Sequence, residues 1–81
     1  MTAVDMKQTI FDVLGTIAPE VEPDDVDPTA NLQDELDIDS MDFLNFMMGL
    51  HKKTGVDIPE KDYAKVSTLN DCVDYLMAKA A

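Results

Sequence analysis

Apolar side chains return at helical spacing near the start of this chain. Between residues 3 and 17 they recur every three or four positions, as one face of a helix requires. The residues of this predicted face are Met6, Ile10, Val13, Leu14 and Ile17. Val4 and Phe11 lie at its margins, and Thr2 is placed to cap its first turn. Because a residue that precedes a proline is disfavoured in α conformation, Ala18-Pro19 is expected to end this helix at about residue 17.

A second apolar stretch runs from about residue 40 to residue 53. Its predicted inward face consists of residues three positions apart with two neighbours, namely Leu44, Met47 and Leu50 flanked by Met41 and Met48. Asp39 is placed to cap the helix, and Asp42 occupies the third helical position of a start that resembles a capping box. Gly55 suits the position just past the end of the helix. Ser40 falls in the first turn, where its hydroxyl is expected to face solvent.

A third long helix is predicted from Thr68 to about Lys79, with Ser67 as its cap. Its inward residues are expected to be Leu69, Val73 and Leu76, with Cys72 and Met77 as further candidates. A short helix is predicted over residues 59–65, since proline favours the first helical position.

Residues 18–39 show no sustained period and contain three prolines, so they are predicted to form a long loop with at most one helical turn after Pro23. Spaced apolar residues along the loop are expected to anchor it in the core: Val21, Val26, Leu32, Leu36 and Ile38. The predicted fold is all-α, a small bundle of three long helices plus one short helix with a long loop between the first two. Residues 1–81 are expected to form a single domain.

The charge of the chain narrows its partners. Seventeen acidic residues stand against six lysines and no arginine, for a formal net charge of −11. Nucleic acid is excluded as a natural partner because its phosphates would be repelled. Protein partners with basic surfaces are favoured instead, although acidity also serves simply to keep a small protein in solution.

Other function classes lose support from residues that the chain lacks. One cysteine, Cys72, and one histidine, His51, cannot form an internal disulfide or a zinc site. The acidic run from Asp34 to Asp42 lacks the spacing, glycine and glutamate of a calcium-binding EF-hand loop, so no metal site is expected. No apolar run is long enough to span a bilayer and the N-terminus has no signal-peptide pattern. We therefore expect a cytoplasmic protein.

The residues around Ser40 carry a resemblance to a known family. Asp39-Ser40-Met41, with Leu36 before it and an apolar helix after it, resembles the 4′-phosphopantetheine attachment site of acyl carrier proteins. The usual form of that site is Asp-Ser-Leu after Leu-Gly-x, so Asp37 stands in place of the glycine and Met41 in place of the leucine. Further stretches that resemble the family are Asp24-Asp25-Val26, Leu32 with Glu35-Leu36, Ile58-Pro59, Val66-Ser67-Thr68-Leu69 and Asp74-Tyr75-Leu76.

This resemblance implies a carrier and not an enzyme. A phosphopantetheinyl transferase would move 4′-phosphopantetheine from coenzyme A onto Ser40, and the thiol of the arm would hold acyl groups as thioesters. Acyl-loading and acyl-processing enzymes with basic docking surfaces, in fatty-acid, polyketide or a related dedicated pathway, would be the other partners of a monomeric protein. A helix N-terminus suits attachment, because its free N–H groups and dipole favour a phosphate.

In this family the second long helix is a docking surface for partner enzymes. The resemblance assigns docking to residues on and beside this helix, namely Asp39, Met41, Asp42, Phe43, Asn45 and Met48. Two orientations are open for Phe43, whose ring either contacts partners or folds over the loop. In place of the neutral or acidic residues usual at these positions, this chain has Asn45, Gly49, His51 and Lys52, which suggests a specialised carrier.

Two alternatives remain open at this point. The chain could carry aminoacyl or peptidyl groups, although it lacks the Gly-Gly-x-Ser approach of such carriers. It could also be an unmodified acidic interaction module in which Ser40 merely begins a helix.

Overall fold

The computed structural model describes residues 2–80, and every regular element in them is helical. The α-helices are α1 (Ala3–Ile17), α2 (Leu32–Leu36), α3 (Ser40–Thr54) and α4 (Leu69–Ala80). Two 3₁₀ helices, η1 (Pro23–Asp25) and η2 (Glu60–Val66), complete the described elements. The predicted all-α bundle, with three long helices and a long segment between the first two, is confirmed.

Local hydrogen bonds fix the start of α1 where the sequence predicts it. The backbone N–H of Asp5 donates to Thr2 Oγ1 at 3.1 Å, and the backbone N–H of Thr2 donates to Asp5 Oδ2 at 3.1 Å. This reciprocal capping box satisfies two donors that an uncapped helix would leave free. The helix ends at Ile17, so its predicted bounds are confirmed.

The ends of α3 are also as predicted, because both have a residue suited to capping. The backbone N–H of Asp42 donates to Asp39 Oδ1 at 2.8 Å, so Asp39 is the N-cap. Gly55 follows the helix with φ 74°, a left-handed conformation that costs glycine little.

The predicted inward face of α3 is wrong in part. The buried residues are Phe43, Phe46, Met47 and Leu50, whereas Met41, Leu44 and Met48 are exposed. Residues three apart drift about 60° round a helix at each step, since one turn takes 3.6 residues. A row that starts at residue 41 therefore winds from solvent into the core by residue 50.

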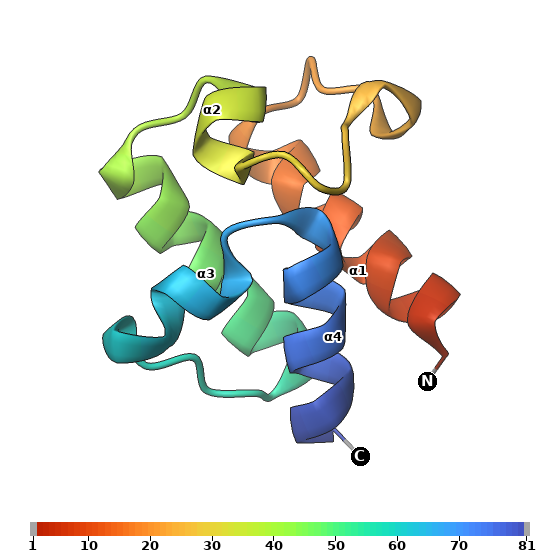
Figure 1. The fold of residues 1–81 in the computed structure, drawn as a ribbon, viewed down its shortest axis with the longest axis vertical. Coiled ribbons are helices and arrows are strands. Elements are labelled where there is room, and N and C mark those ends of the chain that lie inside the picture. The colour runs from red at the N-terminus through yellow and green to blue at the C-terminus, as the bar shows by residue number, and fades with distance from the viewer. Residues whose placement is uncertain (1, 81) are drawn as a thin grey trace.

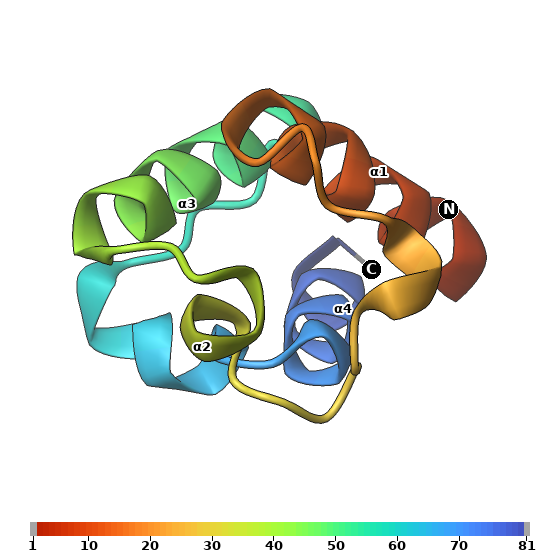
Figure 2. The same cartoon turned by 90° about the horizontal axis from the view of Figure 1, so that it is seen from above.

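The three long helices surround one core (Figures 1 and 2). In Figure 1, α1 rises towards the end of the molecule where α3 begins, while α3 and α4 run down from it. Helix α1 packs against both α3 and α4, and η2 packs against α4. The largest side chains that are fully buried come from all these elements and include Met6, Ile10, Leu14, Phe46, Leu50, Val66 and Leu76.

The long segment between α1 and α3 is anchored as predicted, but it also contains a helix that the sequence did not reveal. Val26, Leu32 and Leu36 are buried, and Val21 and Ile38 pack against the core. Residues Leu32–Leu36 form α2, which is capped by the Asn31 side chain. Backbone N–H groups tie this segment to the start of α4, since Leu32 donates to the Ser67 carbonyl at 2.7 Å and Asn70 donates to the Pro28 carbonyl at 3.0 Å.

The cap of α4 differs from the prediction by one residue. The backbone N–H of Asp71 donates to Thr68 Oγ1 at 3.1 Å, so Thr68 caps the helix and Ser67 does not. The carbonyl of Ser67 instead accepts the hydrogen bond from Leu32. The short helix before it is a 3₁₀ helix over Glu60–Val66, one residue later than predicted.

Candidate functional site

Ser40 is the first residue of α3, and its side chain is exposed as the sequence predicts. In the described part of the chain no hydrogen bond engages its hydroxyl, because the N-cap position is taken by Asp39. The Ser40 oxygen therefore lies at the positive end of a 15-residue helix and is free to react. A phosphate ester on this oxygen would meet the dipole and free N–H groups of the first turn.

The turn that leads to Ser40 contains an unusual backbone conformation. Asp37 follows α2 with φ 53° and ψ 47°, and it is the only residue other than glycine with positive φ among those described. This position is where the attachment-site pattern has glycine. A left-handed conformation costs most residues about 1–2 kcal/mol, and aspartate somewhat less. The turn thus keeps the geometry that glycine would adopt and holds a carboxylate three residues before Ser40.

We expect Asp37→Gly to stabilise the protein by about 0.5–1 kcal/mol, because glycine adopts positive φ without a steric penalty. Urea unfolding followed by circular dichroism measures the change. Asp37→Asn is the matched control, since it removes the same charge and retains a side chain. A glycine variant no more stable than the asparagine variant would contradict this account of the turn.

A cleft opens beside Ser40 between α2, the first turns of α3, and η2. Its volume is about 690 Å³. The residues that line it are Asn31, Gln33, Ser40, Met41, Phe43, Leu44, Glu60, Tyr63, Ala64 and Ser67. Apolar atoms make up most of the surface area that lines the cleft, so the cleft can accommodate a hydrophobic group attached near Ser40.

The wall of the cleft formed by η2 is held to α4 by a hydrogen bond. Tyr75 Oη donates to Asp62 Oδ2 at 2.7 Å, and Lys65 Nζ lies 3.4 Å from Asp62 Oδ1. The hydrogen bond from Tyr75 lowers the pKa of the Asp62 carboxyl below its ordinary 3.8. The same bond raises the pKa of Tyr75 to about 12. Asp62 therefore stabilises the fold above pH 3.8, and this contribution is lost as the pH falls through its lowered pKa.

Tyr75→Phe is expected to lower the free energy of unfolding at pH 7, because Asp62 loses its donor. The difference from the wild type should narrow as the pH falls below 3.8 and Asp62 is protonated. Urea titrations at neutral and acidic pH measure it. Tyr63→Phe is the control, because Tyr63 lies on the same 3₁₀ helix as Asp62, and it should show little effect at either pH. An equal effect of the two substitutions would contradict a stabilising hydrogen bond between Tyr75 and Asp62.

The predicted docking residues do not all face solvent. Asp39, Met41, Asn45 and Met48 are exposed and Asp42 is half-buried. Phe43 is only 6% exposed, so of the two orientations left open its ring takes the inward one, and the prediction of an exposed docking residue at this position is wrong. Its ring makes edge contacts with Phe46 and Tyr63, with centroids 6.1 and 5.8 Å away.

Leu44 lies at the surface, whereas the apolar pattern of the sequence predicts it on the inward face of α3. It is 37% exposed and lines the cleft together with Met41. Leu44 is spaced by about one turn from both Met41 and Met48, so the three share one face of α3. This face is opposite Phe46 and Leu50, and that spacing is the signal by which the sequence could have shown Leu44 to be exposed.

Other reactive side chains lie away from Ser40. His51 is eleven residues further along α3, or about 16 Å at the rise of an α-helix, so the only histidine cannot act on the Ser40 hydroxyl. Cys72 is fully buried in α4, and burial raises the pKa of its thiol to about 12. Within residues 2–80 no cluster of three or more histidine, cysteine or acidic residues could hold a metal ion. None of the helices in this range is long and apolar enough to cross a bilayer.

Comparison with known proteins places this chain in a family. Residues 6–76 match the family model described as the phosphopantetheine attachment site. The chain is 35% identical to an acyl carrier protein from Zymomonas mobilis over 75 residues, which covers 93% of this chain and 90% of the relative. It is 30% identical to an acyl carrier protein from Chlorobium phaeobacteroides over 79 residues, or 98% and 100% of the two chains. The solved structure of the acyl carrier protein from Enterococcus faecalis superimposes with a TM-score of 0.80 at 26% identity, covering 98% of this chain and 99% of that one.

Proposed function

Because this chain belongs to the acyl carrier protein family and bears acyl groups on covalently attached 4′-phosphopantetheine, we propose that Ser40 is the residue to which the arm is attached. The observation that carries this proposal is the exposed hydroxyl at the first residue of α3, free of hydrogen bonds within the described chain. A transferase needs access to that oxygen, and the phosphate that it leaves lies where the helix dipole stabilises negative charge.

Ser40 is favoured over the other candidate nucleophiles by exposure. The chain has one other serine, Ser67, which is half-buried and follows η2. Cys72 is fully buried with a pKa of about 12, so it is almost entirely protonated at neutral pH. Of these three side chains, only that of Ser40 combines solvent access with a position at the start of a long helix.

Incubation with coenzyme A and a promiscuous phosphopantetheinyl transferase tests this proposal. The intact mass is expected to increase by one phosphopantetheine, and one new thiol should react with a disulfide reagent under native conditions. The unincubated protein is the control, because the buried Cys72 should not react until the protein unfolds. A mass that stays constant in the presence of an active transferase would contradict the proposal.

We propose further that the cleft beside Ser40 shelters the acyl chain. Its volume is about 690 Å³, and Met41 and Leu44 line it with flexible apolar side chains. Burial of apolar surface gains about 25 cal/mol per Å², so longer chains gain more from entering.

The expected result is a shift of amide resonances that grows with the length of the acyl group. Residues that line the cleft, such as Tyr63 and Ala64, should shift most in ¹H–¹⁵N spectra of the loaded protein. Resonances of Lys7 and Gln8, which are exposed on α1, should stay constant and act as controls. Equal spectra for short and long acyl groups would contradict sheltering in this cleft.

The partners follow from the same proposal. As a member of this family the chain interacts with a phosphopantetheinyl transferase and with acyl-processing enzymes. We propose that basic surfaces on these enzymes meet the acidic residues beside Ser40, where Asp39 and Asp42 flank the attachment point. Met41, Asn45 and Met48 would complete the docking surface on α3. Fatty-acyl or polyketide cargo is favoured over aminoacyl cargo by this acidity.

The carrier itself is proposed to perform no catalysis and to act as a monomer in the cytoplasm. The single histidine is about 16 Å from Ser40, which leaves the hydroxyl without a general base. A net charge of −11 opposes self-association. A reducing compartment keeps the thiol of the arm free to accept acyl groups.

A further inference from the structure

The outward face of α3 carries a row of exposed apolar side chains that continues into a cation. Met41 is 65% exposed, Leu44 is 37% exposed and Met48 is 56% exposed. Lys52 follows Met48 by four residues, so at 3.6 residues per turn it extends the same row. We call Met41, Leu44, Met48 and Lys52 the docking row. It begins beside Ser40 and ends about three turns further along the helix.

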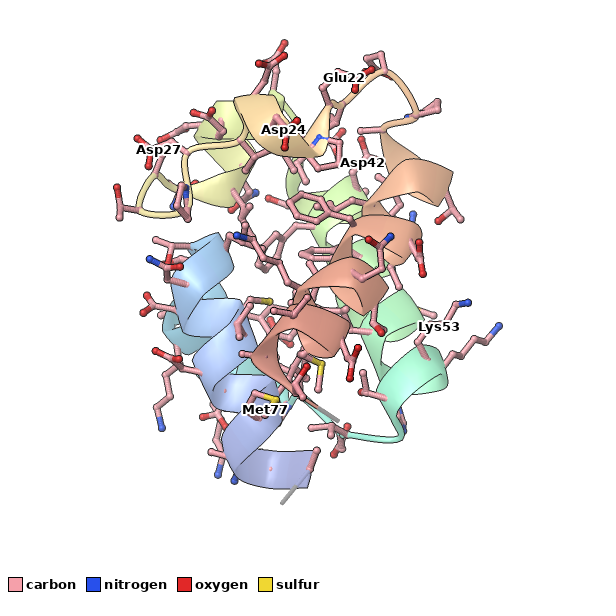
Figure 3. The ribbon with its side chains drawn as sticks, turned by 90° about the vertical axis from the view of Figure 1, so that its right-hand side faces the viewer. Glu22, Asp24, Asp27, Asp42, Lys53 and Met77 are labelled. Atoms are coloured by element: carbon pink, nitrogen blue, oxygen red, sulfur yellow. The ribbon has the colours of Figure 1, made fainter. Side chains whose placement is uncertain are left out.

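The charge of the chain changes sign between the segment before α3 and the C-terminal end of α3. Residues 18–39, which lead to the start of α3, contain nine acidic residues and no lysine. Helix α3 itself contains one acidic residue, Asp42, and ends in His51, Lys52 and Lys53. Figure 3 shows Glu22, Asp24 and Asp27 at one end of the molecule. It shows Lys53 projecting outward from the last turn of α3, away from that end.

The cation at the end of the row is available to a partner. Within residues 2–80 the only ion pair closer than 4.0 Å joins Lys65 to Asp62, so no carboxylate of this part of the chain neutralises Lys52. Lys52 and Lys53 also border a groove of about 330 Å³ between α1 and α3. Val13, Thr16 and Gly49 complete its lining, and the missing side chain of Gly49 allows α3 to approach Val13 of α1 closely.

Resting on the proposed carrier function, we propose that the docking row binds an enzyme surface that is apolar at its centre and acidic where it meets Lys52. A partner surface that is basic throughout would place cations against Lys52, at a cost that rises as the interface excludes water. An acidic side chain at that end converts this repulsion into attraction. The partner's basic residues are then confined to the Ser40 end, which fixes the direction in which the carrier docks.

Two stapled helical peptides, each as long as α3, serve as probes. Both have a basic first turn and a leucine-rich centre, and their last turn contains either two glutamates or two lysines. Peptide affinities for the ¹⁵N-labelled holo-protein are measured by NMR titration at low salt. The measured quantity is the affinity of the lysine-ended peptide divided by that of the glutamate-ended peptide. This ratio is expected to be at least about fivefold higher in Lys52→Glu than in the wild type, because the substitution inverts a local charge pair.

Lys7→Glu is the matched control, since it makes the same change of charge on the exposed side of α1. It should shift the ratio less than about twofold, because screening weakens distant charges. Lys52→Gln should give an intermediate shift and guards against a folding defect in the glutamate variant. A spin label on the glutamate end should broaden resonances near Lys52 and not those near Ser40. Equal shifts for the two glutamate variants, or broadening at the Ser40 end, would overturn the proposal.

Failure of this proposal can be told apart from failure of the carrier assignment. The mass of each sample is measured before titration, so attachment of the arm is known independently of peptide binding. If the protein carries the arm but Lys52→Glu does not shift the affinity ratio, only the polarity of the docking row is overturned. If the protein does not carry the arm but the ratio shifts as expected, the docking row is supported and attachment at Ser40 is contradicted.

Discussion

Ser40→Ala is expected to abolish the mass gain that coenzyme A and a phosphopantetheinyl transferase give the wild-type protein. Alanine lacks the oxygen that would form the phosphodiester, and no other serine is exposed at the start of a long helix. The substitution should leave the fold intact, because alanine favours helices and the cap is supplied by Asp39. Intact-mass spectrometry measures the result, and circular dichroism checks that the helices remain.

Ser67→Ala provides the matched control for this variant. Ser67 is the only other serine, and it lines the same cleft as Ser40. Its hydroxyl is not needed by the proposal, so Ser67→Ala should gain the arm as the wild type does. Retention of the mass gain in Ser40→Ala, or its loss in Ser67→Ala alone, would show that the attachment residue has been misidentified.

Phe46→Ala is expected to be the most destabilising single substitution in α3. Phe46 is fully buried, and its ring packs against that of Phe43 at the centre of the core. Truncation of a buried phenylalanine costs about 3–5 kcal/mol. A domain of this length has a total stability of about 4–12 kcal/mol. We therefore expect the melting temperature to fall by more than about 12 °C. If the total stability lies at the lower end of its range, part of the population should be unfolded.

Leu44→Ala is the control for Phe46→Ala, because both lie in the middle of α3. Leu44 is 37% exposed and faces solvent, so its truncation should cost less than about 1 kcal/mol. Thermal unfolding followed by circular dichroism compares the two variants. Similar melting temperatures would mean that the inward face of α3 has been assigned incorrectly.

The ends of α1 and the start and end of α3 were predictable, because short-range signals determine them. Thr2 and Asp39 cap α1 and α3 through their own side chains, and Gly55 ends α3 in a left-handed conformation. These interactions join residues within a few positions of one another, so the sequence reveals them directly. The exposed position of Ser40 followed from the same reasoning, because Asp39 takes the capping role beside it.

Features that depend on tertiary packing were less accessible from the sequence. Helix α2 spans only five residues, too few for a periodic pattern, and the carbonyl of Ser67 far along the chain anchors its first N–H. The inward turn of Phe43 depends on Tyr63 in η2, whose position the sequence does not provide. The cleft could not be predicted either, since α2, α3 and η2 come together only in the folded protein.

The identity of the modified residue is the central claim, and peptide mapping tests it most directly. Cleavage of the transferase-treated protein after lysine separates residues 8–52, which contain Ser40, from residues 66–79, which contain Ser67 and Cys72. Tandem mass spectrometry is expected to find phosphopantetheine in the 8–52 fragment and to locate it on Ser40. An arm on the 66–79 fragment, or on a threonine of the 8–52 fragment, would contradict the account.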